Sequence, residues 1–251
     1  MLKTRIIPVL LWNNNSLIKG KNFNSWRRVS SLIPSVKIYN SRDVDELIFL
    51  DISATNNNRI PDEYLIKQLA SECSIPLTVG GGITELYQVE HLLASGADKI
   101  SINTSAFYKE NLVSKIAKKF GSQCVVVSID VRKIENKYFC YSNSGNKRQS
   151  IEPVQWARNL QDMGCGEILL TSIDKEGEMK GYDIDISNQI SNAINIPVIA
   201  CGGAGTYDHM FDVISMTKVS AVAASSIFHF TELTPTGAKE HLMKKGINVR
   251  K

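Results

Sequence analysis

The stretch LTVGGGI at residues 77–83 shows the unit from which the chain is built. A short apolar run, typical of a buried strand, ends directly in glycines, and IACGGAG at residues 199–205 repeats this pattern. Its neighbours repeat too: IFLDIS (48–53) aligns with LLTSID (169–174), and ISINTSAF (100–107) aligns with VAASSIF (222–228). The sequence therefore predicts two related halves, in which RIIPVLLW (5–12) matches CVVVSIDV (124–131) and Leu11 falls opposite Asp130.

Eight apolar runs of this kind alternate with amphipathic stretches of helical spacing, a pattern typical of parallel βαβ units. Eight units in 251 residues have the size of a (βα)8 barrel, an α/β fold. An open doubly wound sheet is the rival, but its usual GxGxxG after the first strand is missing. We expect one barrel domain over residues 1–251, with half-barrels of roughly 1–122 and 123–251. The strands are expected at 5–11, 46–51, 77–82, 99–103, 124–130, 167–172, 197–203 and 221–226, and helices at 62–72, 85–97, 106–121, 153–164 and 207–218.

Composition narrows the class of protein. The net charge of +4 is mild and forms no basic block, which argues against a nucleic-acid partner. The first apolar run is too short to span a bilayer and no cleavage site follows it, so we expect a cytoplasmic protein without a membrane partner. The five cysteines form no CxxC pair, so neither a disulfide framework nor a metal site is indicated, and no cofactor is expected. Cys124 and Cys201 are interpreted as small buried hydrophobes.

Glycines and small polar residues gather where the strands should end. Gly80–Gly82 close the third run and Gly202 and Gly203 close the seventh, and polar clusters end the fourth and eighth runs. Glycine lets a ligand approach the backbone, whose N–H groups attract anions. Each half thus offers a candidate phosphate site, and two sites imply a substrate with a phosphate at each end. The alternative is that the glycines only make tight turns.

Acids also end several strands. Asp130 is a candidate general acid or base, because burial in a barrel mouth can tune a carboxyl pKa. A helix cap or structural hydrogen bond is the alternative, and it carries more weight for Asp51 and Asp174. The long segments after Leu11 and Asp130 are expected to be lids, the first a loop and the second a small hairpin. Lys19 in the first segment either screens an anionic ligand or is simply solvated.

Charged residues open four of the runs, namely Arg5, Glu46, Lys99 and Glu167. If they point inward they would meet at the amino end of the barrel, where two cations and two anions could close a ring of ion pairs. The alternative is that all four point out to water.

Together these motifs resemble one known family over essentially the whole chain, the HisF-type cyclase subunits of imidazole glycerol phosphate synthase in the HisA/HisF family. The resemblance implies a (βα)8 barrel with twofold pseudo-symmetry and a lyase or synthase activity. It also implies a HisH-type glutaminase docked on the amino face near Asp98, with ammonia passing through the barrel to a phosphorylated small molecule. The stretches that carry it are LIFLDISA, LTVGGGI, DKISINTSA, GSQCVVVSID, GEILLTSIDKEG, GYD, IACGGAG, AASSIFHF and GINVR.

Roles of single residues follow from the resemblance alone. It makes Asp130 the catalytic acid or base and places Lys19 on a flexible first loop, with Asp51 and Asp174 as further candidates for binding substrate. The ammonia gate corresponds to Arg5, Glu46, Lys99 and Glu167, and the phosphate sites to Gly82, Asn103 and Thr104 and to Gly177, Gly203, Ala224 and Ser225.

The first strand departs from the family pattern. The family reads CLDVKDGRVVKG where this chain reads VLLWNNNSLIKG, so an essential aspartate falls on Leu11 and a second acid on Asn14. The usual DRDG becomes DKEG, with Glu176 for aspartate. Losing one of two positioned acid–base groups typically slows such chemistry by about 10²- to 10⁴-fold. Trp12 and Asn13–Asn15 become candidates for lining a different ligand.

Three hypotheses follow. The one we favour from the sequence is a diverged paralogue that supplies ammonia for making an acetamidino sugar of a surface polysaccharide (lipopolysaccharide biosynthesis), with a sugar amidotransferase as a further partner. It rests on the retained gate and Asp130 beside the substituted Leu11. The second is the ordinary histidine-biosynthesis cyclase, in which a neighbour such as Asp51 would replace the missing acid. The third is a non-catalytic scaffold that channels ammonia.

Overall fold

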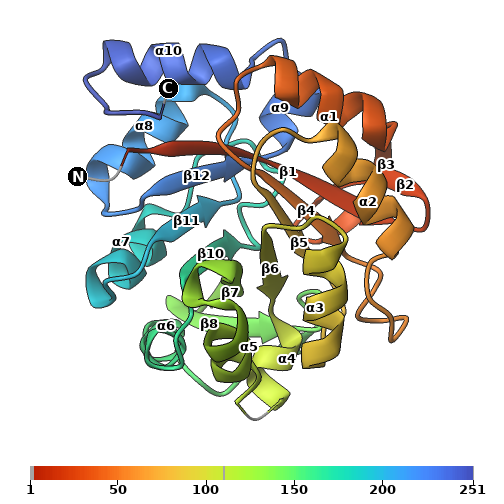
Figure 1. Cartoon of the computed structure of the whole chain (residues 1–251). Coiled ribbons are helices and arrows are strands. Elements are labelled where there is room, and N and C mark those ends of the chain that lie inside the picture. The colour runs from red at the N-terminus through yellow and green to blue at the C-terminus, as the bar shows by residue number, and fades with distance from the viewer. Residues whose placement is uncertain (1–2, 110, 251) are drawn as a thin grey trace.

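A closed barrel of parallel strands forms the centre of the computed structural model, which describes residues 3–109 and 111–250 (Figure 1). Each barrel strand pairs with the next along the chain, β12 returns to β1, and β7 pairs with β10 to complete the ring. Every one of the eight predicted runs is a barrel strand, so the predicted (βα)8 fold is confirmed. The strands are β1 (Arg5–Asn13), β4 (Leu47–Asp51), β5 (Leu77–Gly80), β6 (Lys99–Ile102), β7 (Val125–Ile134), β10 (Glu167–Ser172), β11 (Val198–Cys201) and β12 (Ala221–Ala224).

Helices surround the barrel on its outside (Figure 1). Four of the five predicted helices are found at nearly their expected bounds. The fifth, expected over 106–121, is divided into α4 and α5, and the N-cap Asn111 of α5 has a left-handed backbone (φ 57°) that no continuous helix allows. The helices are α1 (Leu32–Ser41), α2 (Glu63–Glu72), α3 (Leu86–Ala94), α4 (Thr104–Tyr108), α5 (Leu112–Phe120), α6 (Pro153–Asp162), α7 (Ile184–Ala193), α8 (Tyr207–Met216), α9 (Ser226–Phe230) and α10 (Pro235–Lys244), with a 3₁₀ turn at Ser122–Cys124.

The segment after Leu11 is an ordered hairpin, so the predicted loop is wrong. Strand β1 runs on to Asn13, then Asn14 and Asn15 turn with positive φ (42° and 68°), and β2 (Ser16–Lys21) and β3 (Asn24–Ser30) follow antiparallel. Asparagine tolerates this left-handed geometry better than most residues, which accounts for the Asn run as a tight hairpin turn. Trp12 lies against Phe49, with ring centroids 6.2 Å apart. These residues therefore serve the fold, and the prediction that they line a ligand is not supported.

The segment after Asp130 is a hairpin too, as predicted. Strand β7 continues to Ile134 and pairs antiparallel with β8 (Lys137–Ser142), which in turn pairs with β9 (Lys147–Arg148). Both hairpins thus extend the first strand of a predicted half. The register agrees with the alignment of the halves, because Leu11 lies beside Leu50 on β4 while Asp130 lies beside Thr171 on β10. The half-barrel boundaries themselves stay a prediction.

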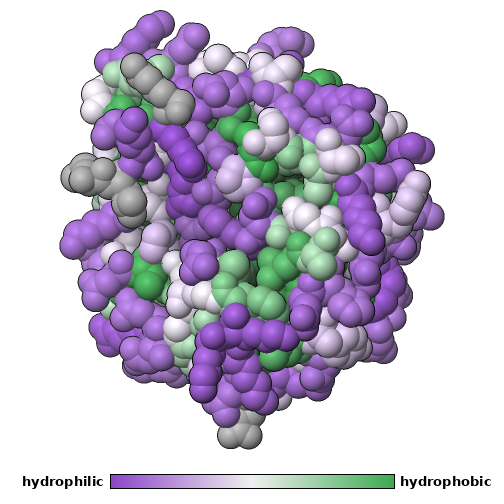
Figure 2. Space-filling view, in the orientation of Figure 1, coloured by the Kyte–Doolittle hydropathy of each residue, from purple (hydrophilic) through white to green (hydrophobic). Residues whose placement is uncertain are grey.

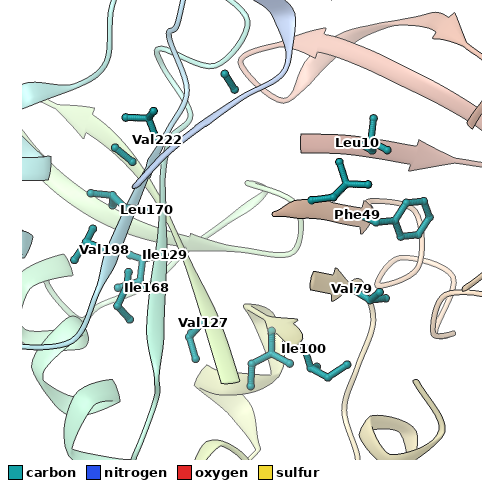
Figure 3. Packing of buried hydrophobic residues seen from close by; sticks show 14 of the residues in the cluster. Leu10, Phe49, Val79, Ile100, Val127, Ile129, Ile168, Leu170, Val198 and Val222 are labelled. Carbon is teal, nitrogen blue, oxygen red and sulfur yellow. The ribbon is translucent and has the colours of Figure 1, made fainter. Parts of the chain in front are cut away.

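Alternate residues of each strand face opposite sides, which divides the buried side chains into two groups. The outward group fills the layer between strands and helices (Figure 3), and includes Leu10, Phe49, Val79, Ile100 and Leu170. The inward group fills the barrel interior with small and branched apolar residues, among them Ile7, Val9, Leu11, Ile48, Val126, Leu169 and Ile199. Leu11 belongs to the inward group, so it faces the axis of the barrel.

The surface is mainly hydrophilic around the outline of the molecule, with hydrophobic side chains showing toward the middle of the viewed face (Figure 2). Among the described residues, none of the helices has the length and apolar character needed to cross a membrane. Segments near the two ends of the described chain lie side by side, since the Thr4 N–H donates to the Asn248 carbonyl at 2.8 Å.

Candidate active site

Four charged side chains close the amino end of the barrel as a ring of ion pairs. Arg5 donates to Glu46 at 2.8 Å and also contacts Glu167. Lys99 lies 2.8 Å from Glu46 and 3.1 Å from Glu167. Each cation thus bridges both acids, and the side chains of the acids are only 5% and 7% exposed. The alternative in which these residues point to water is excluded, and the predicted ring is present.

Burying these four charges costs solvation free energy, which the ion pairs of the ring offset. The pKa of Glu46 is lowered although burial alone would raise it, because Arg5 and Lys99 both stabilise its carboxylate. Asp98 lies just before β6, is exposed, and accepts a hydrogen bond from the Leu77 N–H at 2.8 Å. The ring and Asp98 therefore share the amino end of the barrel.

A cavity of about 490 Å³ opens at the carboxyl ends of the strands. This volume suits a small-molecule ligand, and in barrel enzymes the chemistry lies at this end. The lining brings together predicted site residues from both halves of the chain. Those residues are Asp51, Gly82, Asn103, Thr104 and Asp130, with Leu11 and Glu176 beside them.

Asp130 is the titratable group best suited to move a proton in this cavity. Its Oδ1 accepts from Ser128 Oγ at 2.9 Å and its Oδ2 accepts from Asn103 Nδ2 at 3.2 Å. Burial raises its pKa to about 7, and the hydrogen bonds from Ser128 and Thr171 oppose that rise only in part. A carboxyl with a pKa near neutrality can both release and accept a proton at physiological pH.

Leu11 lines the same cavity with an apolar surface. With Val9, Leu50, Leu169 and Cys201 it continues the barrel interior up to the mouth. The inward side chains between the ring of charges and the cavity are uncharged, and they include the hydroxyls of Thr78, Ser101, Ser128 and Thr171 beside the apolar residues. The position that the repeat and the family resemblance give to an acid holds a side chain that cannot transfer a proton.

Asp51 is already engaged in structural contacts. Its Oδ1 accepts from the N–H and Oγ of Ser53, at 3.1 Å and 2.7 Å, and its Oδ2 accepts from Arg59 at 2.5 Å. The carboxylate is 2% exposed. This arrangement positions the β4–α2 loop, and it does not favour Asp51 as a substitute for the acid missing at residue 11.

The first cradle, which we define as Gly82, Asn103 and Thr104, borders the open cavity. Gly82 has φ +63°, and a Cβ there would lie 1.8 Å from the Arg59 carbonyl, so only glycine fits. Asn103 is the N-cap of α4, and Thr104 Oγ1 accepts from the Asn143 N–H at 3.0 Å. Backbone close to the cavity and polar side chains beside it are features of an anion site.

The second cradle, which we define as Gly177, Gly203, Ala224 and Ser225, is much shallower than the first. It borders a cavity of about 10 Å³, which is room for about one water molecule. Glu176 lines this small cavity as well as the large one and pairs with Lys19. Lys19 is thus buried rather than solvated, and burial lowers its pKa to about 8.

Asp174 and Cys124 lie apart from the two cavities. Asp174 is at the rim, where its Oδ2 accepts from the Lys133 N–H at 2.9 Å and its side chain is 43% exposed. Cys124 and Cys201 are only partly buried, against the prediction, and Cys201 lines the large cavity. No cluster of potential metal ligands occurs among residues 3–109 and 111–250.

Several lining residues were not predicted, because long-range contacts bring them to the mouth. Phe23 and Trp26 come from the first hairpin, and Asn143 and Ser144 come from the second. The Ser144 hydroxyl donates to the Ile52 carbonyl at 3.3 Å across a separation of 92 residues. The unusual length of the two segments was the only signal that pointed to them.

Comparison with known proteins gives a consistent result. The model of a family described as "Histidine biosynthesis protein" matches residues 5–234. Proteins called imidazole glycerol phosphate synthase subunit HisF from Chlorobium phaeobacteroides (strain BS1), Chlorobaculum tepidum and Chlorobium limicola are 44%, 44% and 43% identical to this chain over 250 residues. Each match covers 100% of both chains. The resemblance to the HisF type is confirmed, and nothing in these matches supports the surface-polysaccharide branch.

Proposed function

The chain belongs to the histidine biosynthesis protein family, and from this membership we propose that it acts as the HisF-type cyclase subunit of an imidazole glycerol phosphate synthase. In this role it takes ammonia from a HisH-type glutaminase at the amino face. The ammonia passes the ring of Arg5, Glu46, Lys99 and Glu167 and reacts with a phosphorylated substrate in the mouth. Full-length identity of 44% to proteins named for this synthase supports the proposal.

The observation that carries the proposal is the uncharged barrel interior between the charged ring and Asp130. Neutral ammonia crosses an apolar space more readily than ammonium, because burying an unpaired charge is costly. At the far end, Asp130 has a pKa of about 7 and can exchange the protons that a nitrogen nucleophile must lose. A charged ring, an uncharged interior and a tuned carboxyl in one barrel are the parts that ammonia-dependent synthesis needs.

The ordinary cyclisation is the first candidate for the reaction in the mouth. It would join ammonia to the bis-phosphorylated ribulosyl-formimino carboxamide nucleotide and release imidazole glycerol phosphate and a purine precursor. The names of the relatives favour it over the polysaccharide hypothesis that the sequence alone suggested. Asp130 would then serve as the main proton donor and acceptor, since Asp51 is held by Arg59 and Ser53.

A changed nitrogen acceptor is the second candidate, and Leu11 is the observation that favours it. Leu11 faces the barrel axis and lines the cavity, so one wall of the mouth that carries an acid in the family pattern is apolar here. An acetamido sugar has an apolar methyl group to place there, and it would become an acetamidino sugar when ammonia replaces its amide oxygen, which leaves as water. A sugar amidotransferase would be a further partner in this case.

Cyclisation with excess ammonium salt at raised pH distinguishes the two candidates, because it needs no glutaminase. Rapid turnover of the ribulosyl nucleotide by the wild-type chain would establish the ordinary reaction and refute the changed acceptor. Absence of turnover, with activity restored in Leu11→Asp, would support the second candidate. Asp130→Asn is the matched control, and it should be inactive both in the wild-type chain and in the Leu11→Asp variant.

Binding of the glutaminase tests the proposed partner separately. Asp98→Lys reverses an exposed charge on the amino face without touching the mouth, so it should weaken complex formation and leave ammonium-dependent activity unchanged. Unchanged association by gel filtration would contradict the proposed docking face. A chain that activates the glutaminase but binds no phosphorylated ligand would instead be a channelling scaffold.

A further inference from the structure

Three side chains that can carry protons stand in one row at the mouth of the barrel. Asp130 on β7 pairs with Thr171 on β10, and Thr171 pairs with Cys201 on β11. Paired residues of neighbouring parallel strands point to the same face of the sheet, and all three line the cavity of about 490 Å³. A carboxyl, a hydroxyl and a thiol therefore follow one another along the cavity wall. We call these three side chains the mouth row.

Thr171 connects the two ends of the mouth row. Its hydroxyl hydrogen-bonds the carboxyl of Asp130 and also the thiol of Cys201. A hydroxyl has one O–H donor and two acceptor lone pairs, so it can donate to one neighbour while it accepts from the other. Thr171 is 6% exposed, which keeps bulk water from taking its place between the two groups.

Cys201 supplies a proton donor on a wall that neither Asp130 nor Leu11 occupies. Around the ring, β11 lies two strands from β7 and two strands from β1, so Cys201 stands between Asp130 and Leu11. Burial raises the pKa of the Cys201 thiol, and the Asp130 carboxylate adds to this rise, while Lys19 and Thr171 oppose it. The thiol is therefore protonated near neutral pH, whereas Leu11 has no proton to give.

Both candidate reactions require protons to move from nitrogen to oxygen. Ammonia adds to a carbonyl carbon, which is the ketone of the ribulosyl nucleotide or the amide of the acetamido sugar. The new C–N bond forms while the carbonyl electron pair moves to oxygen. The nitrogen then loses two protons, and the oxygen gains two before it leaves as water. One group must accept from nitrogen while another donates to oxygen.

We propose that the mouth row is a proton relay, in which Asp130 accepts a proton from the nitrogen and Cys201 donates a proton to the departing oxygen. The proton on Asp130 then passes to the Thr171 oxygen as the Thr171 proton passes to the Cys201 sulfur, which restores the carboxylate and the thiol. Two such cycles transfer two protons and need no further reactant. This inference rests on the proposed function in taking addition of ammonia to a carbonyl as the reaction of the mouth.

Turnover of the ribulosyl nucleotide with excess ammonium salt tests the relay in the whole chain. Cys201→Ala should lower kcat by about 10²-fold and change KM little, because it removes a proton donor. Cys201→Ser keeps an O–H donor and should recover kcat to within about tenfold of the wild type. Thr171→Val should also lower kcat by about 10²-fold, while Thr171→Ser should stay within about threefold of the wild type. The double variant of Cys201→Ala and Thr171→Val should be no more than about threefold slower than the slower single variant, because the two residues act as one unit.

Alkylation of Cys201 by iodoacetamide provides a measurement that does not depend on turnover. Mass spectrometry of the peptide that contains Cys201 gives the rate at this thiol alone. Thr171→Val removes a hydrogen bond that stabilises the thiolate, so the rate at pH 9 should fall by about three- to tenfold. Thr171→Ser keeps the hydroxyl and should leave the rate close to that of the wild type.

Cys124→Ala is the matched control, because Cys124 is a cysteine of the turn before β7 and does not line the cavity. It should leave turnover unchanged. Wild-type turnover that persists within threefold in a folded Cys201→Ala would overturn the relay alone, and so would losses in the two single variants that multiply in the double variant. A wild-type chain without turnover would refute the ordinary cyclisation, and an unchanged alkylation rate in Thr171→Val would then overturn the relay as well.

Discussion

Asp130→Asn should stabilise the fold at neutral and alkaline pH. Burial raises the pKa of Asp130 from 3.8 in a model peptide to about 7, so the folded protein keeps this carboxyl protonated where the unfolded chain ionises it. Below pH 3.8 the carboxyl is neutral in both the folded and the unfolded protein, so its burial costs no ionisation energy. As the pH rises from 3.8 toward 7, the unfolded chain ionises while the folded protein does not, and the free energy of unfolding falls. The gap of about three pH units, at 1.36 kcal/mol per unit, gives a cost of about 4 kcal/mol at pH 8. Asparagine cannot ionise, so the variant avoids this cost.

Urea unfolding of both proteins at pH 5 and pH 8 measures the effect. The free energy of unfolding of Asp130→Asn relative to the wild type should be about 2 to 3 kcal/mol more favourable at pH 8 than at pH 5, because at pH 5 only part of the ionisation cost applies. Asp174→Asn is the control, since Asp174 is an exposed rim acid whose contact with Arg132 spans 3.9 Å, and its effect should stay below about 1 kcal/mol. A difference between Asp130→Asn and the wild type that is independent of pH would refute the reasoning.

Three further changes test other parts of the barrel. Arg5→Met leaves Lys99 as the only cation that bridges Glu46 and Glu167 among the described residues, with Arg250 3.8 Å from Glu46, and it should lower the free energy of unfolding by about 3 to 5 kcal/mol in urea denaturation, whereas a loss below about 1 kcal/mol would mean that the ring is solvated. Gly203→Ala places a Cβ 2.1 Å from the Gly181 carbonyl at φ +112°, so the melting temperature should fall by several degrees; an unchanged value would contradict the close packing. Asp130→Asn should reduce ammonium-dependent turnover by about 10²- to 10⁴-fold at saturating substrate, and a loss below tenfold would remove Asp130 from the proton transfers.

The barrel was predictable because its strands are short apolar runs. That signal is local, and it repeats eight times at a spacing that leaves room for one helix each time. Helix α1 was harder to find, because Pro34 and Ser35 interrupt its apolar pattern, although Leu32, Val36 and Tyr39 share its buried face. Neighbouring elements decide that such a segment is a helix, since burial of one face outweighs weak intrinsic propensity.

The site was predictable to the extent that strand ends define it. The charged ring and the position of Asp130 follow from which residues open and close the strands, given that inward side chains meet at the barrel axis. The ion pair of Lys19 and Glu176 at the second cradle does not follow from any local pattern. It depends on Lys19 reaching Glu176 across 157 residues of sequence, and on the fit of the Gly20 backbone against Gly177. The family resemblance placed Lys19 on a flexible loop, and the tertiary contacts of the hairpin make it a buried partner of Glu176 instead.

Leu11 and Asp130 line the same mouth at matching positions of the two predicted halves. The pKa of Asp130 is raised by burial, and the hydrogen bonds that oppose this rise come from the neutral groups of Ser128 and Thr171. An aspartate at residue 11 would add a second carboxyl to the same cavity, and two like charges in one site cannot both ionise freely. The two groups in Leu11→Asp would then titrate as a coupled pair with one apparent pKa below and one above that of Asp130 alone. The pH profile of Leu11→Asp should therefore broaden, whereas an unchanged single midpoint near pH 7 would show that the two positions do not interact. Leu11 thus leaves Asp130 to exchange protons near neutral pH without a neighbouring acid at residue 11.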